Sequence, residues 1–215
     1  MKLYSYFRSS ASYRVRIALN YKNLPYDYCA VHLLKEGGQQ KQADYVALNP
    51  NAVVPTLVDD GHVLTQSLAI CEYLEETHPE PPLLPAHAAD RAYVRAIAQT
   101  IACEMQPLQN LRVTQYLKNV LHLDDETRNA WTRYWVQNGL VILERMVLES
   151  GRAGRFCCGD TPTLADVFLV PQLVSAARFG CSTDPTPTLA RIAERCNNLA
   201  AFVRAAPAQQ PDAEP

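Results

Sequence analysis

The chain has 215 residues, of which 48% are hydrophobic and 20% charged, so it can bury a sizeable core as one large domain or two small ones. Its formal net charge of -2 gives no electrostatic reason to expect nucleic acid or an anionic membrane as the main partner. The first residues lack the layout of a secretion signal and no run approaches the ~20 apolar residues that span a bilayer, so we expect a cytoplasmic protein that binds small molecules or proteins.

The cysteines and histidines show no pattern typical of a metal site or a disulfide framework. The seven cysteines form no C-x-x-C pair, and an odd number of scattered thiols fits a reducing compartment better than a set of disulfides. The five histidines are dispersed, without an H-E-x-x-H sequence or a Cys/His ligand spacing. We therefore expect no metal site.

The first 77 residues predict the element order β-α-β-α-β-β-α. Residues 2–6 are β-prone, and residues 12–22 have apolar positions at helical spacing behind a cluster of serines that can cap a helix. A second strand is predicted over residues 26–31, and "KEGGQQKQ" then indicates a loop before a short helix. In "TLVDDGHVLTQS" two strand-like pieces flank Asp60-Gly61, a strong hairpin signal, and helical periodicity returns after Ser67.

A proline-rich connector separates this α/β region from a second, helical one. Four prolines in residues 79–85 favour an extended segment, so we predict domains over residues 1–80 and 88–215. Beyond the connector the apolar period is 3.6 throughout, which predicts an all-helical domain with kinks or breaks at Pro107 and Pro171. Thr163, three residues before Asp166, indicates a capping box, and the tail "APAQQPDAEP" is expected to fray or lie on the surface.

The stretch "FRSSASYRVRIAL" places serines where the first strand runs into the first helix. Ser10 or Ser12 could simply cap the helix, but hydroxyls at the positive end of a helix can also hold an anion and stabilise a thiolate. Pro55 precedes a strand in an X-Pro bond that can be cis, and Gln66-Ser67 marks another helix start able to bind an anion. Together these features indicate a site for a peptide that carries an anionic sulfur and carboxylates.

Five segments of the chain closely resemble the zeta class of glutathione transferases, which includes maleylacetoacetate isomerases. They are "YSYFRSSASYRVRIAL", "ALNPNAVVPTL", "TQSLAICEYLEE", "QPLQNL" and "GDTPTLADVFLVPQ". The resemblance implies a thioredoxin-like α/β domain followed by an all-helical domain, a homodimer, and glutathione as cofactor. One departure is Ala11, which stands where most members of the class have the cysteine of a Ser-Ser-Cys-Ser motif.

The resemblance also assigns roles to residues. Ser9 and Ser10 are the catalytic candidates, with the hydroxyl of Ser9 expected to partner the glutathione sulfur. The positions that match glutathione-binding residues of the class are Ser9, Ser10, Ala11, Ser12, Gln40, Val54, Pro55, Gln66, Ser67, Gln106 and Asn110. Guanidinium groups suited to a dicarboxylate substrate are expected at Arg8, Arg112 and Arg178, while Arg14 and Arg16 are interpreted as structural.

The function implied by the resemblance is a glutathione-dependent cis-trans isomerase that acts on maleylacetoacetate. A thiolate adds to the activated double bond, the product rotates about the resulting single bond, and elimination regenerates the thiolate. Maleylpyruvate is an alternative substrate, and conjugation of glutathione to small α-halo acids is an alternative reaction. A non-catalytic binding module is disfavoured, since a scaffold does not need these serines, Pro55 and Gln66-Ser67 together.

Overall fold

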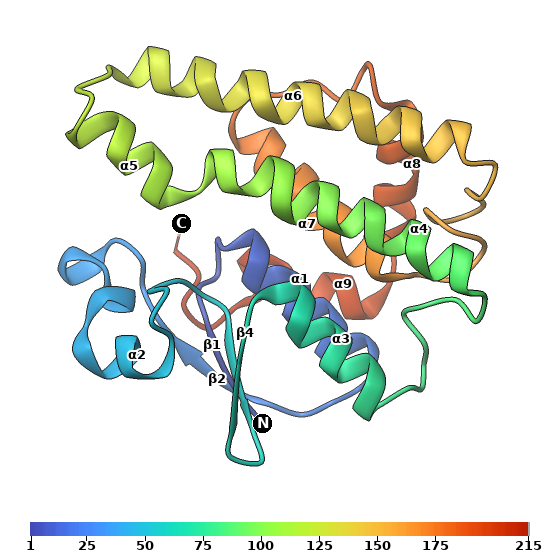
Figure 1. Cartoon of the computed structure of the whole chain (residues 1–215), viewed down its shortest axis with the longest axis horizontal. Helices are drawn as coiled ribbons and strands as arrows, with labels where there is room; N and C mark the ends of the chain where they lie inside the picture. The colour runs from blue at the N-terminus through green and yellow to red at the C-terminus, as the bar shows by residue number, and fades with distance from the viewer. Residues whose placement is uncertain (215) are drawn as a thin grey trace. The chain divides into compact units, whose positions relative to one another are not determined.

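The computed structural model describes residues 1–214, and the chain divides into two compact units (Figure 1). The first unit contains Met1–Leu83 together with the C-terminal segment from Asn197 onwards. The second unit contains Leu84–Cys196. The first is α/β and the second is helical, as the sequence predicts.

A four-stranded mixed sheet forms the centre of the first unit, in the order β2-β1-β3-β4. β1 (Lys2–Ser5) pairs in parallel with β2 (Asp27–Ala30) and antiparallel with β3 (Thr56–Asp59). β4 (His62–Thr65) continues the sheet antiparallel to β3. The hairpin predicted at Asp60-Gly61 is confirmed, and both residues have the positive φ, 45° and 78°, that a tight two-residue turn requires.

Helices complete the thioredoxin-like arrangement of this unit. They are α1 (Ser10–Tyr21), α2 (Ala43–Leu48), α3 (Ser67–Thr77) and α9 (Ala200–Ala205), with short 3-10 turns at Lys35–Gly37, Gln39–Lys41 and Pro207–Gln209. α1 packs against both α3 and α9. It is therefore buried continuously from Ser12 to Leu19, including the side chains of Arg14 and Arg16.

The C-terminal segment belongs to the first unit, whereas the sequence analysis placed it in a second domain over residues 88–215. Arg16 Nε donates to the carbonyl of Ala205 at 2.9 Å, and Asp212 accepts from the Phe7 N–H at 3.1 Å and the Tyr28 hydroxyl at 2.6 Å. A buried guanidinium needs acceptors, and the C-terminal segment supplies one. The tail is therefore anchored, through contacts that its local composition does not reveal.

The second unit is built from helices. They are α4 (Ala88–Gln99), α5 (Leu111–Asn119), α6 (Asp125–Glu149), α7 (Leu164–Arg178) and α8 (Pro187–Cys196). After α4 the chain passes through a π-helical segment, η3 (Thr100–Met105), and a 3-10 segment, η4 (Gln106–Gln109), so the break expected near Pro107 is confirmed. Pro171 instead lies inside α7, which continues to Arg178.

The capping box predicted at the start of α7 is confirmed. The Asp166 carboxylate accepts from the Thr163 N–H at 2.8 Å and from the Thr163 hydroxyl at 2.9 Å. Its other oxygen accepts from the Cys157 N–H at 2.9 Å, and burial raises the pKa of Asp166. Asp166 thus joins the loop before α7 to the first turn of the helix.

Two general features bear on function. No helix in residues 1–214 is long and apolar enough to span a membrane. Within the same residues, no group of three or more His, Cys, Asp or Glu side chains is placed to hold a metal ion.

Candidate glutathione site

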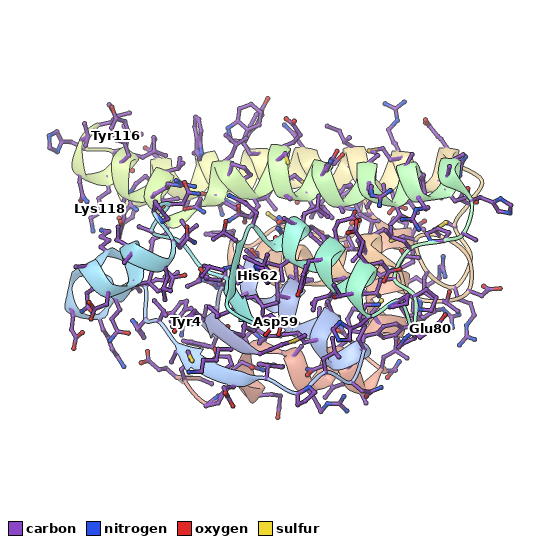
Figure 2. The ribbon with its side chains drawn as sticks, turned by 60° about the horizontal axis from the view of Figure 1, so that its bottom comes forward. Tyr4, Asp59, His62, Glu80, Tyr116 and Lys118 are labelled. Carbon is purple, nitrogen blue, oxygen red and sulfur yellow. The ribbon has the colours of Figure 1, made fainter. Side chains whose placement is uncertain are left out.

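The strand register brings three of the predicted site segments to one edge of the sheet. Thr56, the first residue of β3, pairs with Tyr4 on β1 and with Thr65 on β4. The loop that follows β1, the loop that enters β3 and the start of α3 therefore meet at this edge. The hairpin that pairs Asp59 with His62, both labelled in Figure 2, lies at the opposite end of β3.

Ser9 is the N-cap of α1, so neither Ser10 nor Ser12 has the capping role that the sequence allowed. Its Oγ accepts from the Ser12 N–H at 3.1 Å, which leaves the hydroxyl proton of Ser9 free to donate. Ser9, Ser10 and Ala11 are partly exposed, whereas Ser12 is fully buried. A hydroxyl that can donate beside the positive end of a helix stabilises a thiolate.

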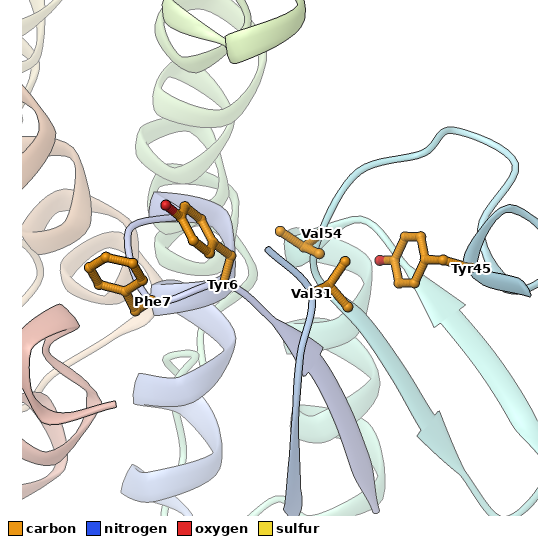
Figure 3. Packing of buried hydrophobic residues seen from close by; sticks show 5 residues of the cluster. All are labelled: Tyr6, Phe7, Val31, Tyr45 and Val54. Atoms are coloured by element: carbon orange, nitrogen blue, oxygen red, sulfur yellow. The ribbon is translucent and has the colours of Figure 1, made fainter. Parts of the chain in front are cut away.

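Val54 offers a peptide-binding edge at the entry to β3. Its side chain belongs to the buried cluster of Tyr6, Phe7, Val31, Val54 and Tyr45 that Figure 3 shows, which fixes the position of its main chain. In the part of the chain that the structure describes, the Val54 N–H and C=O make no hydrogen bond. The bond from Val54 to Pro55 is cis, as anticipated. A free N–H and C=O on one residue can pair with the main chain of an extended peptide.

A buried polar network that sequence analysis missed holds the segments on either side of Val54. The hydroxyl of Tyr45 donates to the Val53 carbonyl at 2.7 Å and lies 2.9 Å from Thr56 Oγ1. The Asn49 amide donates to the same carbonyl at 2.8 Å and to Thr56 Oγ1 at 3.2 Å. Burial raises the pKa of Tyr45, so its hydroxyl keeps the proton it donates.

The start of α3 has the properties of a carboxylate site. Gln66 is exposed and adopts a positive φ of 68°, which is uncommon for a residue with a side chain and occurs preferentially at functional sites. No side chain caps this helix, so N–H groups of its first turn remain available to a ligand. Ser67 Oγ accepts from Arg14 Nη1 at 3.1 Å, a contact that sequence analysis did not anticipate.

Gln40 is directed into the first unit. It is buried, and its Nε2 lies 3.4 Å from the Leu33 carbonyl. Gly38, at a φ of +103°, leaves room for this amide, because an added Cβ would lie 2.8 Å from the Gln40 side chain. The contact of Gln40 with glutathione stays a prediction.

The remaining predicted residues lie on exposed or half-buried positions. Arg8 is exposed, with its guanidinium 5.0 Å from the centre of the Phe7 ring. In the second unit, Gln106 begins η4, and Asn110 caps α5 by accepting from the Arg112 N–H at 3.0 Å. Arg112 is exposed on the first turn of α5, and Arg178 is exposed at the last residue of α7. Gln106, Asn110 and Arg112 are therefore close in the chain. Arg178 comes from another helix.

The protein's own thiols are poorly suited to act as nucleophiles. All seven cysteines are free, and the thiols whose pKa departs from the ordinary value are shifted upward. Burial raises the pKa of Cys71 to about 12 and that of Cys157 well above normal. A reactive sulfur at this site is therefore best supplied by a ligand.

The donor set of the first unit fits glutathione. The Ser9 hydroxyl suits an anionic sulfur, the Val54 main chain suits a peptide, and the start of α3 with Ser67 suits a carboxylate. Glutathione carries these three groups in one molecule. All the residues of this set come from the edge of the sheet defined by Thr56.

Comparisons with known proteins agree with this chemistry. The family model "Glutathione S-transferase, N-terminal domain" matches residues 3–82. A probable maleylacetoacetate isomerase from Vibrio cholerae is 48% identical, over 98% of this chain and 97% of the relative. A holo structure of a bacterial maleylpyruvate isomerase, described as a zeta-class glutathione transferase, is 45% identical with a TM-score of 0.96, over 100% of both chains.

A second solved structure carries ligands in its active site. It is a maleylacetoacetate isomerase from Anaeromyxobacter dehalogenans with bound dicarboxyethyl glutathione and citrate. That protein is 45% identical, with a TM-score of 0.87, over 100% of this chain and 97% of its own. By sequence and by fold, the chain belongs to the glutathione transferase family, among the zeta-class proteins that include maleylacetoacetate and maleylpyruvate isomerases.

Proposed function

We propose that this protein is a glutathione-dependent isomerase that converts maleylacetoacetate to its trans isomer. The observation that carries the proposal is the geometry of Ser9. Its oxygen accepts from the Ser12 N–H, and its proton is available to a ligand. Bound glutathione supplies a thiolate that adds reversibly to the cis double bond and leaves again after rotation. It is regenerated in each turnover.

The residues of the first unit would bind and orient this thiol. Ser9 donates to the sulfur, and the positive end of α1 favours the ionised form. Ser10 and Ala11, on the first turn of α1, line the same end, and the main chain of Val54 before Pro55 pairs with the peptide. Gln66 and Ser67 take the γ-glutamyl carboxylate at the start of α3.

Arginines are proposed to bind the carboxylates of the substrate and the negative charge that develops beside its carbonyl groups. Arg8 directly precedes the serines, and Arg112 lies on the first turn of α5, where the helix end adds to its positive charge. Arg178 provides a third exposed guanidinium. Gln106 and the Nδ2 of Asn110, whose Oδ1 is used for capping, are proposed as further polar contacts.

One alternative concerns the substrate and another concerns the reaction. Maleylpyruvate carries the same cis-enedione acid chemistry, and a comparison of kcat/KM for the two substrates decides between them. Conjugation of glutathione to small α-halo acids would use the same thiolate and the same arginines. Release of halide with net loss of glutathione would identify that reaction.

We also propose a cytoplasmic homodimer. α6 exposes apolar side chains at seven-residue intervals, among them Tyr134 (61% exposed), Val141 and Leu148 (58% exposed), with Trp135 and Ile142 beside them. Apolar side chains repeated along one helix face favour burial against a second copy of the chain. Seven free thiols suit a reducing compartment.

The activity test couples purified protein and maleylacetoacetate to fumarylacetoacetate hydrolase, and follows ultraviolet absorbance with and without catalytic glutathione. Substrate loss that needs glutathione but does not consume it is expected. If neither maleylacetoacetate nor maleylpyruvate is turned over under these conditions, the proposed isomerase activity is refuted.

Substitutions of Ser9 separate capping from chemistry. Ser9→Asp keeps the helix cap but has no proton to donate and repels a thiolate, so we expect a loss of kcat/KM on the order of 100-fold. Ser9→Thr keeps both the cap and the proton and should retain most activity. Ser150→Ala, which removes a local helix-end hydroxyl in the second unit, is the matched control. Full activity in Ser9→Asp, or in a Ser9→Ala, Ser10→Ala double variant, would refute the catalytic assignment.

A further inference from the structure

We infer that Arg14 is a positioning residue for the carboxylate subsite at the start of α3. Its guanidinium donates to the oxygen of Ser67, which orients the hydroxyl and leaves its proton for a ligand. The inference rests on the proposed glutathione site and adds a residue that the sequence analysis interpreted as structural. Together with the positive charge of Arg14, this orientation favours an anionic hydrogen-bond acceptor in the subsite.

The contact joins two helices that are far apart in the sequence. Arg14 lies on α1 and is 1% exposed, and its Nη1 is 3.1 Å from Oγ of the buried Ser67, 53 residues later. α1 and α3 pack against each other. The positive charge of Arg14 also reaches Cys71, one helical turn beyond Ser67, where it opposes the rise in pKa that burial causes. The guanidinium is therefore held against the first turns of α3.

The direction of the hydrogen bond is fixed by chemistry. A guanidinium has five N–H donors and no acceptor, so the Ser67 oxygen must accept. The single proton of the Ser67 hydroxyl is then available to another partner. A carboxylate can accept that proton, whereas an ammonium group cannot.

Ser9 is arranged in the same way on α1. Its oxygen accepts from the Ser12 N–H, so its proton is likewise left for a ligand. The two hydroxyls therefore both donate at the same edge of the sheet, one at each helix start. A ligand with two negatively charged groups is complementary to this pair.

The charge of Arg14 adds to the effect of its hydrogen bond. A guanidinium stays protonated at any working pH, and the N-terminus of α3 carries about half a positive charge. Both make the local electrostatic potential more positive, which favours the binding of an anion. A role limited to packing would require only the volume and the hydrogen bond of this side chain.

A double-mutant cycle in glutathione binding tests the inference. The variants are Arg14→Met, Ser67→Ala and the double variant, and binding is measured by calorimetry on the full-length protein. We expect Arg14→Met to weaken binding at least about tenfold in the wild-type background and less than about threefold in the Ser67→Ala background. Equal losses in the two backgrounds would overturn a role through Ser67.

A glutathione analogue separates positioning from general structural damage. In 4-aminobutyryl-cysteinyl-glycine the γ-glutamyl carboxylate is absent. We expect wild type to bind this analogue at least about tenfold more weakly than glutathione, and Arg14→Met to bind it about as well as wild type does. Similar affinity of wild type for both ligands would overturn the inference without any variant, even if Arg14→Met fails to fold.

Kinetics and a conservative variant complete the test. Arg14→Met should raise KM for glutathione much more than it lowers kcat, and Arg14→Lys, which keeps the charge and a donor, should recover part of the loss. Arg191→Met removes an exposed arginine of the second unit and should match wild type. A loss confined to kcat would contradict a positioning role in binding.

The outcomes also distinguish the two proposals. If wild type neither binds glutathione nor turns over with it, the proposed function fails and the inference fails with it. If wild type binds glutathione and isomerises its substrate while the cycle shows no coupling, only the role of Arg14 is refuted.

Discussion

Two buried polar side chains of the first unit and two of the second hold different kinds of segment. In the first unit, Arg14 and Tyr45 hold residues that the proposed site requires, Ser67 and the segments beside Val54. In the second unit, Glu144 accepts from the N–H groups of Thr188 and Leu189 at 2.9 and 3.0 Å, and Asp166 accepts from Cys157 and Thr163. These carboxylates fasten the starts of α8 and α7. Loss of Arg14 or Tyr45 should therefore impair ligand binding, whereas loss of Glu144 or Asp166 should impair folding.

The largest effect is expected from Asp166→Ala. It removes the capping box and leaves the buried Cys157 N–H without an acceptor, so the free energy of unfolding should fall by about 3 kcal/mol. Urea denaturation measures this change. The folded fraction should still bind glutathione with the affinity of wild type.

Asp160→Ala is the control, because Asp160 is exposed and accepts from the Arg155 N–H at 3.0 Å. It should leave the unfolding free energy within about 0.5 kcal/mol of wild type. The contrast between the units fails if Asp166→Ala weakens glutathione binding while stability is preserved.

A smaller effect on stability, with a clear effect on binding, is expected from Tyr45→Phe. The change removes one hydroxyl from the network around Val53 and Thr56, which costs about 1 kcal/mol of stability. The Val54 main chain then has a looser position, so KM for glutathione should rise several-fold while kcat changes little.

Tyr73→Phe provides the comparison for Tyr45→Phe. The Tyr73 hydroxyl donates to Asp59 at 3.0 Å, at the hairpin end of the sheet. Steady-state kinetics should show an unchanged KM for this variant. Equal rises in KM for both variants would show that the effect is not specific to the Val54 segment.

The smallest effect concerns Asp124, the N-cap of α6. Its carboxylate accepts from the Thr127 N–H at 2.7 Å, and that bond lowers the pKa of the exposed Asp124. Because the pKa is lower in the folded state, the stabilisation is present at neutral pH and is lost as pH falls through the folded pKa. Asp124→Ala should therefore lower Tm slightly at pH 7 and converge with wild type in strong acid. A Tm difference that stays constant across this range would exclude the carboxylate as its cause.

Local features of the sequence predicted much of the fold. The hairpin at Asp60-Gly61 and the capping box of Thr163 and Asp166 follow from turn and cap chemistry within a few residues. The change from an α/β region to a helical one follows from hydrophobic periodicity. These features need no knowledge of contacts that are distant in the sequence.

The parts that could not be predicted depend on long-range contacts. Arg14 meets Ser67 across 53 residues, and Asp212 meets Phe7 across 205. Spacing within a helix shows that Arg14 and Arg16 are unusual, but it does not show which acceptors they reach. For the same reason Gln40 could be named as a site candidate, while its inward orientation depends on Gly38 and Leu33.

The placement of the C-terminal segment has a consequence for the order of folding during synthesis. The acceptor that Asp212 provides for the Phe7 N–H, two residues before Ser9, emerges from the ribosome only after the whole second unit has been made. The loop that carries the proposed catalytic serines thus lacks one of its fixed contacts until Asp212 has been made. A nascent chain truncated before Asn197 contains every proposed ligand-binding residue and still lacks the segment that fastens them.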